Sequence, residues 1–323
     1  MAAPTNTYTT FNLRGNKEDV DNVIYNLDPT ATPFVSGLGS GVKVDARNHE
    51  WQEDTYAAAN KDNARVEGDD FAGNALTPTL MLRNTIQTFT KDIVTSGVAN
   101  AIAKYGRDDE QDYQLGKAAI EIRKDIEAAI LSANPGVAGN TTTASKMAGL
   151  ELYANISVSH GATGSTAAIT NATLPTVAPT DGTQRTLTEA IFVAGLQTMW
   201  ENGGMPKTCY LTMTKKGVVN STFVGIAQRR VDVPPEGFAS VIGAVDIYAW
   251  DTGPVAFVPL YQDRIRQRTL FVTDGKSVKR GYLRGIQRTR MGKTGDNVKD
   301  MMVTDVTLKV TNRRGVLKIA DLS

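Results

Sequence analysis

The sequence of 323 residues has a single cysteine, Cys209, and only two histidines, His49 and His160. One cysteine excludes an intrachain disulfide and favours folding in a reducing compartment. Because the histidines are far apart and neither has the spacing of a metal motif, we expect no metal site. The strings Gly275-Lys276-Ser277 and Gly292-Lys293-Thr294 lack the earlier glycine of a phosphate loop, so turns are expected there and no cofactor.

Catalytic constellations, membrane spans and targeting segments are also missing from the sequence. No nucleophile, base and orienting group form a recognisable motif, and Cys209 lies in an apolar segment where an inert thiol is typical. We therefore expect no enzyme. The absence of a run of about 18 apolar residues and of a signal peptide indicates synthesis in the cytoplasm.

The chain has almost no net charge, with 35 Lys and Arg residues against 34 Asp and Glu residues. A net charge of +1 gives no overall attraction to nucleic acid or to a membrane surface. It also weakens repulsion between copies, which suits a protein that packs against itself.

Residues 1–48 are predicted to form an N-terminal arm with one helix. Its apolar residues recur at the spacing of one helix face, and Asp28-Pro29 ends the pattern. A short helix with one apolar stripe must bury that stripe elsewhere, in its own chain or in another copy. The stripe consists of Val20, Val23, Ile24 and Leu27.

Residues 49–95 are predicted to form a long acidic hairpin. Few large apolar residues lie between Glu53 and Gly73, and Leu80 to Val94 has the pattern of an extended strand. A lone two-stranded ribbon is only marginally stable in water, so we expect the hairpin to become ordered on a partner. The spacing of its acids does not match a calcium loop, and we assign them to a contact between subunits. These acids are Glu50, Glu53, Asp54, Glu67, Asp69 and Asp70.

Residues 96–185 contain the clearest helix, predicted over 108–133, followed by a loop-rich insertion. At about 1.5 Å per residue this helix would span roughly 39 Å. Its predicted core residues, spaced on one face, are Leu115, Ile122 and Ile126. Residues 186–262 alternate between helix and strand patterns, and residues 263–323 are mostly strand and turn.

A basic stretch runs from Arg264 to Lys293, with ten basic residues against Asp274 alone. It is expected to bind either DNA phosphates or, as we prefer, the acidic hairpin of a neighbouring copy. Alternation along a strand would place Arg264, Arg266 and Arg268 on one face. The predicted inter-subunit residues also include Lys279, Arg280 and Arg284.

This order of parts resembles the tailed-bacteriophage major capsid proteins of the Hong Kong 97 fold. The string LDPTATPFVSGL after the first helix resembles their arm, and GYLRGIQRTRMGKTGDNVKDMMVTDVTLKV resembles the C-terminal signature of a major head protein subfamily. The resemblance implies an α+β fold. It equates residues 1–48 with the N-arm, 49–95 with the E-loop, 96–185 with the peripheral (P) domain and its spine helix, 186–262 with the axial (A) domain, and 263–323 with returning P-domain strands.

The resemblance also implies a function and partners. Copies would assemble as hexamers and pentamers of an icosahedral head, enclosing double-stranded DNA that contacts the inner face without sequence specificity. Because the arm starts almost at Met1, a separate scaffolding protein is expected, together with a portal and a possible decoration protein. Two alternatives stay open: another self-assembling virion component, such as a tail-tube or decoration protein, and a DNA-binding protein that uses residues 264–293.

Overall fold

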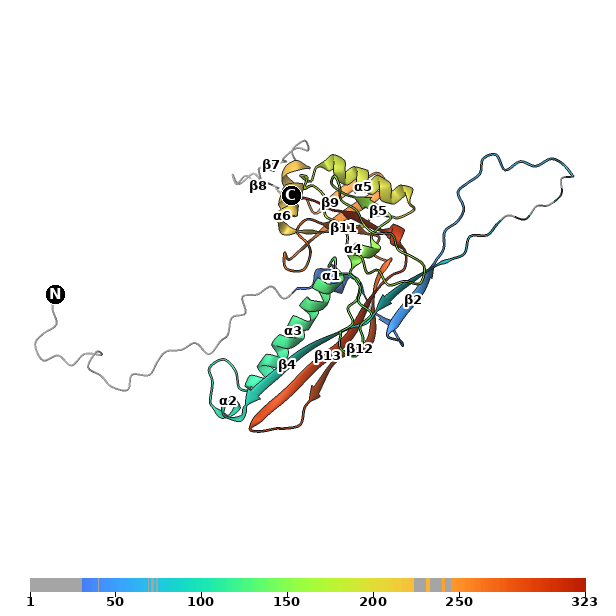
Figure 1. The fold of residues 1–323 in the computed structure, drawn as a ribbon. Coiled ribbons are helices and arrows are strands. Elements are labelled where there is room, and N and C mark those ends of the chain that lie inside the picture. Colours follow the sequence, from blue (N-terminus) through green and yellow to red (C-terminus); the bar gives the residue numbers. More distant parts are fainter. Residues whose placement is uncertain are drawn as a thin grey trace, which may run out of the picture.

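The structure is a computed structural model that describes residues 31–39, 41–68, 70, 73, 75–223, 231–232, 240–241 and 245–323. Within these residues the chain builds two main sheets, one of four strands and one of six, and two separate hairpins. Figure 1 shows an elongated subunit, with the long four-stranded sheet at one end and the six-stranded sheet at the other. The predicted helix over residues 16–28 lies outside the described residues.

The long sheet has the order β1-β12-β13-β4 and is backed by one long helix, α3 (Glu110–Ile130). Asp109 caps α3 by accepting a hydrogen bond from the Gln111 amide at 2.7 Å. Leu115, Ile122 and Ile126 are buried, so the predicted helix and its register are confirmed. The sheet strands are β1 (Val42–Lys43), β12 (Val278–Arg290), β13 (Asn297–Val310) and β4 (Gln87–Ser96), and the short α2 (Gly97–Ala101) follows β4.

The second sheet has the order β5-β14-β11-β6-β10-β9. Helices α5 (Glu189–Glu201) and α6 (Met213–Thr222) bury apolar side chains against it, and Phe192 lies at the centre of this core. The short α4 (Leu150–Tyr153) contributes to the other core, beside the long sheet. The strands are β5 (Ser157–Ser159), β14 (Val316–Ile319), β11 (Leu270–Thr273), β6 (Thr208–Thr212), β10 (Gly253–Leu260) and β9 (Ile247–Trp250).

Residues 263–323, predicted as strands of the P domain, are divided between the two sheets. β12 and β13 lie in the long sheet, whereas β11 and β14 pair with each other in the six-stranded sheet, where β11 also pairs with β6. Strand patterns alone do not specify partners, because any exposed edge offers the same backbone groups.

The predicted strand from Leu80 to Val94 is broken at Ile86. Its first half is β3 (Leu80–Thr85), which pairs with β2 (Asn48–Glu53) as the base of the acidic hairpin. Its second half is β4, which pairs with β13 in the long sheet. The remaining elements are α1 (Pro33–Gly37), β7 (Val231–Asp232), β8 (Ser240–Val241) and the 3-10 turn η1 (Arg313–Gly315).

Candidate assembly surfaces

The loop 54–79 joins β2 to β3 and projects away from the rest of the subunit (Figure 1). Every described residue of this loop is exposed, including three large apolar ones: Tyr56 at 103%, Val66 at 79% and Leu76 at 94%. Structureless loops longer than ~12–15 residues are uncommon in compact domains and are usually functional or disordered. Exposed apolar residues along such a loop favour a binding surface.

The six predicted hairpin acids do not share one environment. Glu53 is buried at the end of β2, where its carboxylate lies 2.6 Å from the Arg313 guanidinium of η1. Glu50 is 3.5 Å from Arg83 on the paired strand. Glu53 therefore stabilises its own subunit, and its assignment to a contact between subunits is withdrawn. Asp54, Glu67 and Asp70 are exposed on the loop, and Asp69 lies outside the described residues.

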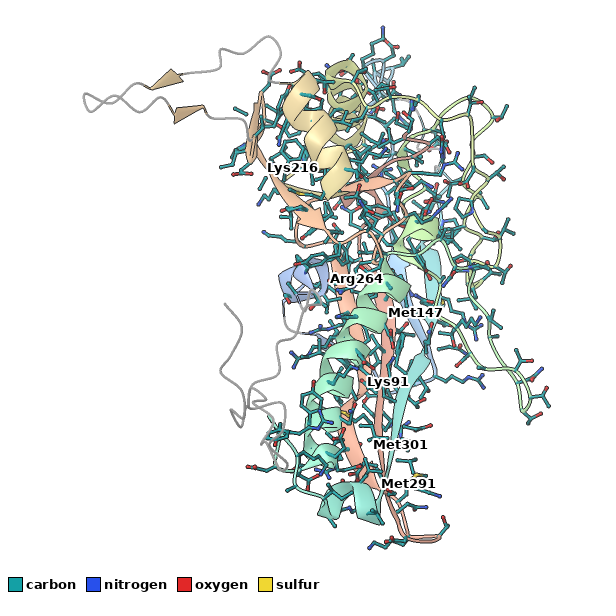
Figure 2. The ribbon with its side chains drawn as sticks, turned by 90° about the vertical axis from the view of Figure 1, so that its left-hand side faces the viewer. Lys91, Met147, Lys216, Arg264, Met291 and Met301 are labelled. Atoms are coloured by element: carbon teal, nitrogen blue, oxygen red, sulfur yellow. The ribbon has the colours of Figure 1, made fainter. Side chains whose placement is uncertain are left out.

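Arg264, Arg266 and Arg268 do not lie on a strand, so that prediction is wrong. They occupy the turn-rich segment 261–269 between β10 and β11, and carboxylates of their own chain bind them. Figure 2 shows Arg264 at the junction of α1 and α3. There it is buried, donates to the Ala31 carbonyl at 3.1 Å and lies 3.7 Å from the Glu127 carboxylate.

The other two arginines enter a charged cluster between α4, β14 and the loop around residue 181, in which Glu151 is buried and Asp181 is exposed. Arg266 binds Glu151 at 2.9 Å and also Asp181, which Arg268 contacts at 3.1 Å. Burial raises the pKa of Glu151, and the hydrogen bond from Arg266 lowers the pKa of Asp181. These ion pairs hold one subunit together, so we no longer assign the three arginines to an interface.

The cluster also contains a fully buried lysine, Lys318 of β14. Its ammonium donates to the Glu151 carbonyl at 3.3 Å and to the Thr166 hydroxyl. Burial lowers the pKa of Lys318 to about 8, although the charge of the nearby Glu151 carboxylate raises this pKa. A long charged side chain inside an apolar strand was not predicted, because its partners come from segments distant in sequence.

The basic side chains of β12 are partly neutralised by the neighbouring strand. Arg284 pairs with Asp305 of β13, and Arg288 lies 2.8 Å from Asp300. The guanidinium of Arg280 stacks over the Tyr282 ring at 4.6 Å. Lys279 is exposed and, among the described residues, has no ion pair. The charge excess counted within 264–293 was therefore misleading, since the balancing acids follow that segment in sequence.

The long sheet has one face that α3 does not cover at the end distant from the six-stranded sheet. Side chains of β4 alternate: Lys91 points to α3, where it binds Asp125 at 2.9 Å, whereas Val94 lies on the other face and is 59% exposed. Val94 pairs with Lys299 of β13, and the backbone carbonyl of Lys299 accepts a hydrogen bond from the Met291 amide at 2.9 Å. Met291, 48% exposed, and Met301 lie at the same end of the sheet (Figure 2).

The described residues contain no group of three or more His, Cys, Asp or Glu side chains placed to hold a metal ion. No helix among them has the length and apolarity needed to cross a membrane. Cys209 is buried in β6, and burial raises the pKa of its thiol, which disfavours the reactive thiolate.

Comparisons with known proteins agree on one class. The family model described as the SU10 major capsid protein matches residues 3–323. The major capsid protein of Escherichia phage Phieco32 is 36% identical over 132 residues, a match that spans 41% of this chain and 37% of that protein.

Solved structures show the same fold at low sequence identity. A chain of the Cyanophage A-1(L) capsid asymmetric unit superposes with a TM-score of 0.67 at 15% identity, covering 97% of this chain and 98% of that chain. A chain from Mycobacterium phage Ogopogo gives a TM-score of 0.58 at 10% identity, covering 97% and 99%. The predicted α+β fold of the Hong Kong 97 type is confirmed.

Proposed function

This chain belongs to the SU10 major capsid protein family and forms the shell of a tailed-phage head; we propose that its copies meet there as hexamers and pentamers, each laying loop 54–79 across a neighbour. The observation that carries this proposal is the loop itself. Tyr56, Val66 and Leu76 are almost fully exposed on a segment that leaves its own subunit. Burying such side chains contributes roughly 1.5–3 kcal/mol each before the cost of ordering the loop.

The neighbour's surface that fits this loop is the exposed end of the long sheet. Val94 and Met291 provide apolar contacts there, on the face that α3 leaves open. Lys293, exposed in the turn after β12 at this end of the sheet, supplies positive charge for the loop acids Asp54 and Glu67. Each exposed ion pair is worth only ~0–1 kcal/mol, so we assign register to the charges and most of the affinity to the apolar contacts.

The remaining partners follow from the family. We infer packaged DNA on the inner face, a separate scaffolding protein, a portal and a possible decoration protein as partners of the assembled shell. A DNA-binding protein built on residues 264–293 is a weaker candidate, because Arg264, Arg266 and Arg268 are bound by carboxylates of their own chain. We also infer that the work of the chain is structural rather than catalytic.

The test replaces the three apolar loop residues together, as Tyr56→Ser, Val66→Ser and Leu76→Ser. Because these side chains are exposed in their own subunit, the free subunit should unfold thermally as the wild type does, whereas closed shells should disappear in sedimentation and electron microscopy. The matched control replaces the polar loop residues Asn60, Asn63 and Thr77 by Ser and should assemble normally.

A second variant, Val94→Glu with Met291→Glu, tests the receiving face in the same assay. It should also give folded subunits without shells. Normal shells from the triple loop variant would contradict the loop contact, and normal shells from the double variant would contradict this receiving face alone. Hydrogen exchange should show the loop amides protected only in shells.

A further inference from the structure

A groove of about 480 Å³ opens between α1, α3 and β12, on the face of the long sheet that carries the helix. Its floor is apolar and its walls come from three segments distant in sequence. Ile126 of α3 is buried below it, whereas Ile286 of β12 is 38% exposed at its edge. The other apolar lining residues are Val35 and Tyr282. The groove is distinct from the exposed sheet face that we assign to the neighbour's loop, because that face lies on the opposite side of β12.

Two arginines, Arg123 of α3 and Arg280 of β12, also line the groove. Neither forms an ion pair with an acid in the described part of the chain. The Nε atom of Arg280 is buried and has no hydrogen-bond partner among these residues. The Arg280 guanidinium lies over the Tyr282 ring at 4.6 Å, and the charges of both arginines oppose the rise that burial causes in the pKa of Tyr282. An apolar floor between two cations fits a peptide that carries both apolar side chains and carboxylates.

The N-terminal segment of the chain has this composition. Residues 18–28 contain acids between the apolar residues of the predicted helix stripe, and the acids are Glu18, Asp19, Asp21 and Asp28. The segment is also connected to the groove by only a few residues of the chain. Thr32 lines the groove, and Arg264 holds the preceding Ala31 carbonyl at 3.1 Å. Asp28 is therefore confined within roughly 14 Å of Thr32, at about 3.6 Å per residue.

We propose that residues 18–28 dock as an amphipathic helix into this groove of their own chain. Ile24 and Leu27 would cover Tyr282 and Ile286, and the acids would bind Arg123 and Arg280. The short connection from Thr32 favours the arm of the same chain over that of another copy, because a tethered segment has a high effective concentration at its site. Docking would fix the direction in which the arm leaves the subunit, whether or not loop 54–79 contacts a neighbour.

Disulfide trapping in the full-length free subunit tests this contact. Leu27→Cys combined with Ile286→Cys should oxidise to an intrachain bond, seen as a faster-migrating band without reductant. The matched control combines Asn26→Cys with Ile286→Cys, which has the same reach along the chain but places the thiol away from the apolar stripe. Cys209 is buried and should not interfere. The first pair should form about tenfold more intrachain disulfide, the ratio that a preference of ~1.4 kcal/mol produces. Equal yields from the two pairs would overturn the proposal.

Charge provides the second arm of the experiment. Arg123→Gln with Arg280→Gln, added to the Leu27 and Ile286 pair, should lower the disulfide yield, whereas Lys279→Gln, on the opposite face of β12, should not. Circular dichroism checks that each variant is folded, and Arg123→Gln alone serves if the double change unfolds the subunit. An unchanged yield would overturn the role of the arginines. Mixing subunits that carry only one cysteine each separates copies: a disulfide-linked dimer as the main product would overturn docking within one chain.

Discussion

Glu53 provides the sharpest test of whether the acidic hairpin belongs to its own subunit or to an interface. Its carboxylate accepts a hydrogen bond from the Arg313 side chain at 2.6 Å and another from the Arg313 amide at 3.4 Å. Arg313 is itself buried and otherwise contacts the Asn155 side-chain oxygen at 3.0 Å. The pair therefore ties the base of loop 54–79 to η1, the connection between β13 of the long sheet and β14 of the six-stranded sheet.

Glu53→Ala would leave the Arg313 cation buried without its counter-ion and would remove the acceptor of its amide. Breaking a buried ion pair by removing one partner costs about 3–5 kcal/mol, and both residues are buried enough to approach the lower limit. Glu53→Gln keeps an acceptor oxygen and loses only the charge, so a cost of about 1–2 kcal/mol is expected. With an urea m-value of about 3 kcal/mol/M, the alanine variant should unfold at a midpoint roughly 1 M lower.

The assay is urea unfolding of the free subunit, followed by the fluorescence of Trp51, Trp200 and Trp250. The matched control is Asp54→Ala, the next residue along the chain, which is exposed and should change the free energy of unfolding by less than about 0.5 kcal/mol. If Glu53 worked only at an interface, both alanine variants would unfold at the urea concentration of the wild type. That result would refute the intrachain role derived from the structure.

Three further predictions use the same subunit. Ile126→Asp places a charge at a position that is 2% exposed and should abolish soluble folding, whereas Lys117→Asp on the exposed side of α3 should not; normal soluble yield of the first variant would show that the helix faces elsewhere. Reversing Arg264, Arg266 and Arg268 to Glu should prevent folding rather than only assembly, because Glu127 and Glu151 are buried beside them; a folded monomer on circular dichroism would contradict this. Lys318 has a pKa of about 8 in the folded chain, against 10.5 ordinarily. Between these pH values the unfolded chain binds more protons than the folded chain, so the free energy of unfolding should rise with pH. Urea unfolding should show this rise for the wild type and not for Lys318→Met, and equal pH profiles would count against the buried ammonium.

Local periodicity explains which elements were predictable. The spacing of Leu115, Ile122 and Ile126 predicted a helix with one buried face, and α3 has that face against β4 and β13. The scarcity of large apolar residues after Glu53 predicted a projecting hairpin, and loop 54–79 is exposed throughout its described residues. Both patterns concern residues close in sequence, where backbone geometry alone decides which side chains share a face.

Charge partners were not predictable in the same way. The excess of basic residues over 264–293 suggested a free binding surface, yet Asp300 and Asp305 neutralise part of it from the next strand. An alternating pattern in Arg264, Arg266 and Arg268 suggested a strand, but their partners come from α3, α4 and the loop around Asp181. The net charge of a segment leaves out the acids that are distant in sequence and that folding places beside its basic residues.

The sequence by itself therefore determined the class of protein, the long helix with its buried face, and the exposed hairpin, since each depends on a local pattern or a recognisable string. Tertiary structure alone decided which strands pair, where β3 ends and β4 begins, and which charges are neutralised within the subunit. The physical reason is that strand edges and ionised side chains select partners by distance in space. Only the packed chain brings Glu53 to Arg313, or Arg266 to Glu151, and removes them from the surface available to another copy.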